Sequence, residues 1–257
     1  MCGRYSLTTP VDGIRRLFGF QELPNLPPRY NIAPTQAVLA VLRGDGLKDQ
    51  EAGDSAPRAR LLRWGLIPSW AKDPAIASKL INARSETVRD KPSFKKAFQR
   101  RRCLLPADGF YEWKTIHGKK QPFRIRFADG EPFAFAGLWE RWQAPDGGEI
   151  ESCSILTAEA APQIADIHHR MPVILDPGAF DAWLGAPQDD AEALLGPYRG
   201  ARALEAYPVD RRVNDVRNDD EALIEPVALS EPEEAATPED PAEPEGARRA
   251  GGQLSLF

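Results

Sequence analysis

The sequence has no long apolar run. Its first twenty residues, MCGRYSLTTPVDGIRRLFGF, contain no continuous hydrophobic stretch behind a basic start, and no segment reaches the ~18 apolar residues that a membrane span requires. This absence argues against a secretory signal and a membrane partner, and it predicts a cytoplasmic protein. With 257 residues, of which 42% are hydrophobic, the chain can bury one substantial core or two modest ones.

Cysteine is also scarce. The three cysteines, at positions 2, 103 and 153, form no CxxC pair and have no metal-ligand spacing. We therefore expect no metal and no cofactor. Cys103 and Cys153 lie in apolar, strand-like segments, where a cysteine usually serves as a small buried hydrophobe.

An excess of positive charge is missing as well. The formal net charge is −5, but seven acids and two bases fall within residues 231–257, so 31 acids balance 31 bases in the remaining chain. A neutral body binds nucleic acid only where positive charge is locally concentrated. One concentration surrounds KPSFKKAFQ, a predicted short helix, although most basic runs are only solvated faces. Its bases are Lys91, Lys95, Lys96, Arg100, Arg101 and Arg102.

Short apolar segments with strand character dominate the chain. They are AVLAVL, RARLLRWGL, RCLLP, GFYEW, PFRIRF, PFAFAGLW, SCSILT, MPVIL, LEAYPV and ALIEPV. The turn HGKK predicts a hairpin between GFYEWK and QPFRIRF, while DPGAFDAWLG begins with an Asp cap and a proline, which predicts a helix. We predict one α+β domain over residues 1–230, on a curved, mainly antiparallel, barrel-like sheet with short flanking helices. GDGLKDQEAGDSAP, residues 44–57, has the composition of a polar hairpin insertion.

What the chain does have is a cysteine directly behind the initiator. Removal of Met1 would leave Cys2 with a free α-amine and a thiol on adjacent carbons. Such a 1,2-aminothiol captures aldehydes, because the amine forms an imine and the thiol then closes a five-membered thiazolidine ring. An α-amine titrates near ~8 against ~10.4 for lysine, so much more of it is unprotonated at neutral pH. Position alone favours an incidental cysteine; the residues that follow it change that interpretation.

Five stretches occur in a defined order along the chain. They are MCGRY at the start, YNIAPTQ at 30–36, INARSET at 81–87, DGFYEWK at 108–114 and HHRMPVIL at 168–175. Together they resemble the SOS response-associated peptidase family, the abasic-site-processing proteins, over residues 1 to about 229. This resemblance implies covalent attachment to abasic sites in single-stranded DNA through the amino-terminal cysteine. The ring-opened abasic sugar is the aldehyde that a 1,2-aminothiol would capture.

The resemblance carries four catalytic roles onto this sequence. Cys2 would be the nucleophile, and Asn82 would hold it in place, because an amide both donates and accepts hydrogen bonds. Glu112 would orient the amine and accept its proton, and His168 would protonate the sugar ring oxygen to favour opening. Simpler interpretations stay open: Asn82 as a turn residue, Glu112 on a wet strand face, and His169 in the place of His168.

Five further residues are candidate DNA contacts. Guanidinium groups bind phosphates bidentately, and Arg4, Arg84 and Arg170 resemble the family's contacts to the DNA backbone. Bases beside the lesion lose a stacking partner, which Pro34 and Trp70 could replace, with ordinary core or loop packing as the alternative. VNDVRN, residues 213–218, resembles another family segment and receives no role.

Residues 231–257 are rich in Glu, Pro and Ala, which predicts a disordered acidic tether. It ends in QLSLF, which resembles the pentapeptide that bacterial replication and repair proteins insert into the sliding clamp, although a chance apolar end is the alternative. Leu254, Leu256 and Phe257 would fill apolar subsites and Gln253 would make polar contacts, at the end of a tether spanning about 25 Å. The motif implies a bacterial, replication-linked protein at the nucleoid, and we expect a monomer.

The leading hypothesis is thus a shield that crosslinks to abasic sites in single-stranded DNA through Cys2. One alternative is a thiol peptidase, in which Cys2 attacks a peptide bond with His168 as base and could release Met1 by self-cleavage. A non-covalent, clamp-associated DNA binder is another. A lyase side reaction is also open, because an imine at this sugar promotes β-elimination when ring closure is slow.

Overall fold

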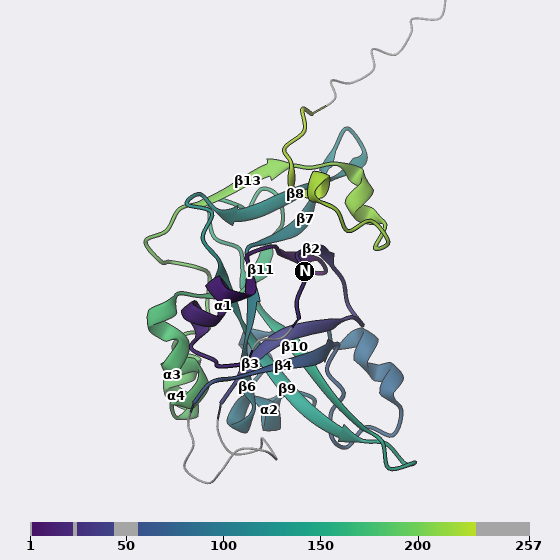
Figure 1. Ribbon diagram of the computed structural model, residues 1–257, viewed down its shortest axis with the longest axis vertical. Coiled ribbons are helices and arrows are strands. Elements are labelled where there is room, and N and C mark those ends of the chain that lie inside the picture. The colour runs from purple at the N-terminus through teal and green to yellow at the C-terminus, as the bar shows by residue number, and fades with distance from the viewer. Residues whose placement is uncertain (1, 23–24, 44–55, 230–257) are drawn as a thin grey trace, which may run out of the picture.

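A computed structural model describes residues 2–22, 25–43 and 56–229, which form one α+β fold of two sheets with short helices around them (Figure 1). The fold class predicted from the sequence is confirmed. The predicted tail 231–257 lies outside the described residues, as does the predicted insertion apart from residues 56 and 57.

Within the described part of the chain, five strands close into a barrel. They are β3 (Ala37–Leu42), β4 (Arg58–Trp64), β6 (Arg102–Ala107), β9 (Phe133–Gln143) and β10 (Glu149–Glu159). Their order is β10-β4-β3-β6-β9, and β9 pairs again with β10, which closes the ring and removes its edges. β4 and β10 run parallel, and the other neighbours run antiparallel. The continuous apolar run AVLAVL suits such a strand, because β3 is buried at every position after Ala37.

Three short strands extend the barrel beside β9 and β10. β5 (Asn82–Arg84) runs parallel to β10, β11 (Arg170–Pro172) runs antiparallel to it, and β12 (Ile174–Leu175) pairs with β9. The prediction of a single strand at MPVIL is therefore wrong in detail. Val173 bridges the two partners, since its N–H bonds to Leu156 on β10 and its carbonyl accepts from Ala136 on β9, each at 2.9 Å.

The second sheet packs against the barrel through aromatic rings. Its strands, in order, are β13 (Leu204–Pro208), β8 (Lys119–Phe127), β7 (Gly109–Ile116), β1 (Tyr5–Leu7) and β2 (Arg29–Ile32). The hairpin predicted at HGKK joins β7 and β8, with His117 and Gly118 at φ 48° and 73°. Tyr5 packs edge-on against Trp64 and Phe135, at centroid distances of 5.4 and 5.6 Å, which seats β1 on the barrel.

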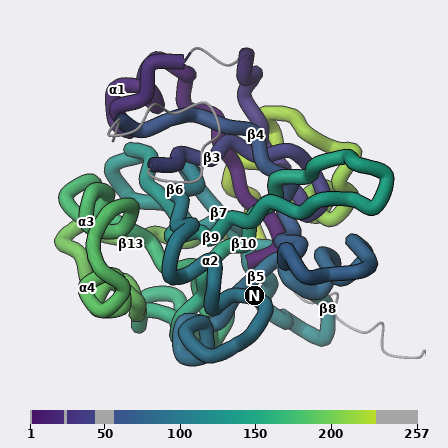
Figure 2. The backbone as a smooth tube through the Cα atoms, turned by 90° about the horizontal axis from the view of Figure 1, so that it is seen from below, coloured from purple at the N-terminus to yellow at the C-terminus, as the bar shows by residue number. Residues whose placement is uncertain are grey.

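The helices are short and lie outside the barrel, with α3 and α4 together on one flank (Figure 2). The α-helices are α1 (Val11–Phe18), α2 (Lys95–Arg100), α3 (Phe180–Gly185) and α4 (Gln188–Glu192). The 3-10 helices are η1 (Pro74–Lys79), η2 (Ser85–Thr87), η3 (Pro177–Ala179), η4 (Arg211–Asn214) and η5 (Glu221–Ile224). Helices predicted at KPSFKKAFQ and DPGAFDAWLG are confirmed as α2 and as η3 with α3.

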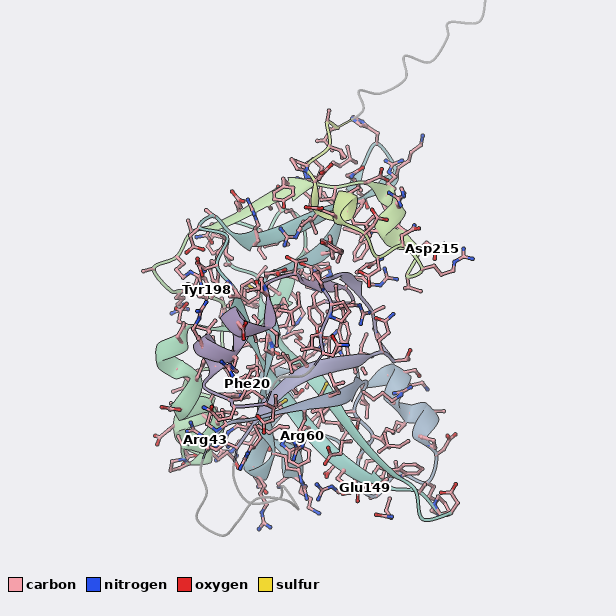
Figure 3. The ribbon with its side chains drawn as sticks, in the orientation of Figure 1. Phe20, Arg43, Arg60, Glu149, Tyr198 and Asp215 are labelled. Atoms are coloured by element: carbon pink, nitrogen blue, oxygen red, sulfur yellow. The ribbon has the colours of Figure 1, made fainter. Side chains whose placement is uncertain are left out.

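Two local predictions need correction. ALIEPV does not form a strand, since η5 occupies its first residues and a single bridge joins Pro226 to Val209. A proline has no N–H for a continuing ladder. The Asp176 side chain does not cap η3. It accepts a hydrogen bond from the Tyr198 hydroxyl at 3.1 Å instead. Figure 3 shows Tyr198 near the edge of the molecule.

The basic run around α2 is partly structural. Arg102 is buried and donates to the carbonyls of Trp183 and Phe98, at 2.5 and 3.0 Å. Arg101 forms an ion pair with Glu140 at 2.9 Å. The cysteines at 103 and 153 are fully buried, as expected for small core residues. This run therefore supplies less exposed positive charge than its composition suggests.

Candidate functional site around Cys2

Cys2 lies on the extension of β1 beside β7. Tyr111 donates its main-chain N–H to the Arg4 carbonyl at 3.0 Å, so the pairing of β1 with β7 continues toward the amino terminus. Cys2 is fully buried, and its Sγ lies 3.7 Å from the Arg4 carbonyl oxygen. Burial and then the charge of Glu112 raise the pKa of the Cys2 thiol well above its usual value, so the sulfur is protonated at neutral pH.

Asn82 holds the main chain of Cys2. It begins β5 and lies opposite Ile155 on β10, while Trp64 anchors the preceding residue by donating its Nε1–H to the Ile81 carbonyl at 2.9 Å. The Asn82 amide Nδ2 donates to the Cys2 carbonyl at 2.8 Å. Its Oδ1 is buried, and none of the described residues donates to it. An acceptor thus remains available beside Cys2 for one more N–H.

The Glu112 side chain points into the protein interior and does not lie on a solvent-exposed face of its strand. It lies on β7 opposite Phe123, and only 2% of it is exposed. Burial raises the pKa of Glu112 to about 7. At neutral pH the side chain is therefore divided between acid and carboxylate, the condition under which one group can both accept and return a proton. Its charge acts on the Cys2 thiol, which places the two groups in one electrostatic environment.

His168 directly precedes the segment that pairs with the end of β10. Its Nδ1 lies 3.0 Å from both the main-chain nitrogen and the main-chain oxygen of Arg170. Burial is the main cause that lowers the pKa of His168, and the ring stacks on that of His169 at a centroid distance of 4.5 Å. An ion pair of 2.6 Å between Lys114 and Asp166 ties the turn before His168 to β7.

The three candidate arginines have different surroundings. Arg4 donates to the Val213 carbonyl at 2.8 Å. The buried Arg170 directs Nη1 and Nη2 at the two carboxylate oxygens of Glu86, at 2.9 and 3.0 Å. Arg84 is exposed and forms no ion pair with any residue that the structure describes. Arg84 is thus the most available of the three for a phosphate.

The two candidate stacking residues lie on separate loops. Trp70 is 57% exposed and donates its Nε1–H to the Pro92 carbonyl at 3.4 Å. It lines an open hollow of about 440 Å³ together with Lys72 and Lys79. Pro34 is half-buried in the turn after β2. An exposed indole beside two lysines has the features of a base-stacking platform flanked by positive charge.

YNIAPTQ and VNDVRN, which lie far apart in the sequence, meet in the fold through Asn31. Asn31 is buried, and its Nδ2 donates to the carbonyls of Val213, Asp215 and Asn218, at 3.1, 3.1 and 2.8 Å. The side chain of Asp215 lies on the outer side of this segment (Figure 3). Both stretches resemble segments of the family. Because they lie far apart in the sequence, nothing in the sequence indicates that the Asn31 amide would bind three carbonyls of the second stretch. Arg4 contacts the same segment, because it also donates to the Val213 carbonyl.

Comparison with known proteins identifies the family. The family model of the SOS response associated peptidases (SRAP) matches residues 1–216. The chain belongs to this family. The five stretches quoted from the sequence all lie within the matched region of this SRAP chain, so the resemblance drawn from them is confirmed.

Curated relatives of this SRAP chain come from bacteria and vertebrates. Abasic site processing protein YoqW of Bacillus subtilis is 43% identical over 232 residues, covering 88% of this chain and 99% of that protein. Abasic site processing protein HMCES of Gallus gallus is 31% identical over 264 residues, covering 88% of this chain and 78% of the relative. The alignment thus extends over nearly all of the described fold.

Solved structures agree with the SRAP fold. A protein from Bacteroides thetaiotaomicron superposes with a TM-score of 0.77 at 24% identity, covering 88% of this chain and all of that one. A protein from Bordetella bronchiseptica superposes with a TM-score of 0.69 at 32% identity, covering 81% of this chain and all of that one.

Among the described residues of this SRAP chain, no helix combines the length and apolar character of a membrane-crossing segment. The same residues contain no group of three His, Cys, Asp or Glu side chains placed to hold a metal ion.

Proposed function

We propose that this protein processes abasic sites in single-stranded DNA by forming a thiazolidine crosslink through Cys2 after removal of Met1. The observation that carries the proposal is the 2.8 Å hydrogen bond from Asn82 to the Cys2 carbonyl, beside a glutamate whose charge acts on the Cys2 thiol. The names of the relatives, abasic site processing proteins, support the substrate. An amide and a carboxyl group around an amino-terminal cysteine suit a reaction that begins at its amine.

The reaction balances without an external oxidant or reductant. His168 donates a proton to the ring oxygen of the abasic sugar as the C1′–O4′ bond breaks, and the C1′ hydroxyl gives its proton to solvent, which leaves the aldehyde. The unprotonated Cys2 amine, having given a proton to Glu112, adds to that aldehyde, and loss of one water leaves the imine. The Cys2 sulfur then adds to the imine carbon while the thiol proton passes to the nitrogen, which closes the five-membered ring.

DNA contacts follow from the exposed groups around this site. We assign phosphate contacts to Arg4 and Arg84, with Arg84 the more exposed of the two; Arg170 is buried and paired with Glu86, so it would reach a phosphate only if that pair opened. Trp70 and Pro34 would stack on bases next to the lesion. Such contacts hold the strand while the sugar enters beside Cys2.

The peptidase alternative has less support. A thiol protease needs its sulfur as a thiolate, but burial and Glu112 raise the pKa of the Cys2 thiol. The amine-first reaction does not need a preformed thiolate. Both ideas use Cys2 and His168, and the protonated state of the Cys2 thiol favours aldehyde capture.

The QLSLF tail, residues 253–257, lies outside the described residues, and we propose sliding-clamp binding for it. In this proposal Leu254, Leu256 and Phe257 enter an apolar pocket of the bacterial clamp, and Gln253 makes polar contacts at its edge. Clamp binding would keep the crosslinking domain close to replicated single strands.

The experiment that tests the crosslink is intact mass spectrometry of the purified protein mixed with an abasic oligonucleotide. We expect a heat-stable adduct with the full mass of the oligonucleotide less one water, on a chain that lacks Met1. Cys2→Ala should give no adduct, whereas Cys153→Ala, which removes a buried thiol elsewhere, should retain it. Adduct formation by Cys2→Ala, or by a chain that retains Met1, contradicts the proposal.

A further inference from the structure

Arg170 connects His168 to the carboxylate of Glu86. The main-chain N–H of Arg170 points at Nδ1 of His168 at 3.0 Å, and the Arg170 carbonyl oxygen lies 3.0 Å from the same atom. A neutral ring nitrogen accepts from the N–H, and a protonated one donates to the carbonyl. The imidazole therefore keeps a partner at Nδ1 in either protonation state and can exchange a proton without reorienting.

The other end of Arg170 is held by a bidentate ion pair. Its two terminal nitrogens lie 2.9 and 3.0 Å from the carboxylate oxygens of Glu86, and Nη2 also donates to the Thr157 carbonyl at 2.6 Å. Parallel N–H···O contacts of this kind specify the plane of the guanidinium as well as its position. The pair thereby joins three elements: η2 with Glu86, β10 with Thr157 and β11 with Arg170.

The depth of this pair distinguishes it from an ordinary surface ion pair. The Arg170 side chain is 10% exposed, whereas that of Glu86 is 49% exposed. Exposed pairs contribute little, but removing the acid here would leave a nearly buried guanidinium without its counter-charge. The hydrogen bond from Arg170 is the main cause that lowers the pKa of Glu86, so Glu86 is ionised at neutral pH.

We infer that Glu86 is a positioning residue for His168: through Arg170 it holds the main-chain groups that orient the imidazole. This inference rests on the proposed crosslinking only where it assigns His168 a step in that reaction. The contrary idea is that Glu86 competes with a DNA phosphate for Arg170. The two ideas predict opposite changes in binding and rate when the carboxylate is removed.

The first test needs no DNA. The chain has three histidines, so ring nitrogen NMR of histidine-labelled protein gives few signals, and His168→Gln identifies the relevant pair. We expect Glu86→Gln to shift both His168 ring nitrogens and leave His117 unchanged. Glu159→Gln is the matched control, because Glu159 lies opposite Arg170 in the β10–β11 register without an ion pair to it among the described residues. Unchanged His168 signals in Glu86→Gln overturn the inference.

The second test separates chemistry from binding. In single-turnover reactions with an abasic oligonucleotide, we expect Glu86→Gln to lower the rate at saturation by about tenfold, part of a general acid's usual contribution, with unchanged half-saturation. A tighter half-saturation with an unchanged maximal rate identifies competition with phosphate and overturns the inference. Absence of any adduct with the unaltered protein refutes the proposed function instead, and the NMR comparison still decides the role of Glu86. If Glu86→Gln does not fold, Glu86→Asp keeps the charge, shortens the reach and should shift the same signals.

Discussion

Glu112 is a carboxyl group in a place where most proteins have an apolar side chain. Acids are seldom buried, because the charged form loses its hydration. Here the raised pKa, about 7, has a use: near neutrality the group can take a proton from an amine and release it again. Burying this carboxyl group lowers the stability of the fold, and a substitution of Glu112 can measure by how much.

We predict that Glu112→Gln stabilises the fold, and more so as pH rises. The pKa of Glu112 rises from 4.5 to about 7 on folding, so between these values the folded chain binds more protons than the unfolded chain and loses stability with pH. Glutamine does not titrate, so its advantage should grow to the order of 3 kcal/mol by pH 8. Urea unfolding at pH 4.5 and pH 8 measures the difference. The same variant should form adduct more slowly, and an equal stability gain at both pH values contradicts the assigned burial effect.

At the scale of elements, the junction of β1 with β7 decides where Cys2 lies. Asp108, between β6 and β7, accepts hydrogen bonds from the Ser6 hydroxyl at 2.7 Å and from the main-chain N–H groups of Thr8 and Thr9. Arg124 on β8 pairs with the same carboxylate at 3.2 Å, and both side chains are buried. One acid thus fastens the end of β1, and so determines how its other end runs beside β7.

We predict that Asp108→Asn destabilises the protein by about 3–5 kcal/mol, because it leaves the buried Arg124 without its counter-charge. Asp129→Asn is the control. Asp129 and Arg202 also form an ion pair, at 2.7 Å, but the Asp129 side chain is half-exposed. That change should cost less than about 1 kcal/mol. Chemical denaturation compares the two, and similar losses for both variants would show that the buried network does not hold β1.

Element prediction from sequence succeeded where the local pattern and the tertiary environment agree. AVLAVL and RCLLP became barrel strands, and HGKK became a hairpin turn, since short apolar runs and a turn glycine favour these structures by themselves. MPVIL and ALIEPV were less accurate because their outcome depends on partners. Val173 changes partner where β9 and β10 diverge, and Pro226 permits only one bridge.

At the scale of the whole molecule, the SRAP match covers residues 1–216, while QLSLF lies well beyond it. We predict that deletion of residues 253–257 leaves adduct formation and the melting temperature unchanged but abolishes binding to the bacterial sliding clamp. Surface plasmon resonance with immobilised clamp measures the binding, and a chain whose last five residues are scrambled is the matched control. Clamp binding that survives both changes contradicts the tail proposal, and loss of adduct would show that the tail takes part in the reaction.

The sequence by itself determined the chemical groups and the family. Cys2, Asn82, Glu112 and His168 were named from short stretches, because residue types and their local spacing are properties of the chain alone. The tertiary structure decided their states. Burial excludes water from Glu112. The bond from Asn82 to the Cys2 carbonyl and the Glu86–Arg170 pair join groups from different elements of the fold. Hydration and hydrogen-bond partners depend on which strands meet, and that is settled only when the barrel and the second sheet pack together.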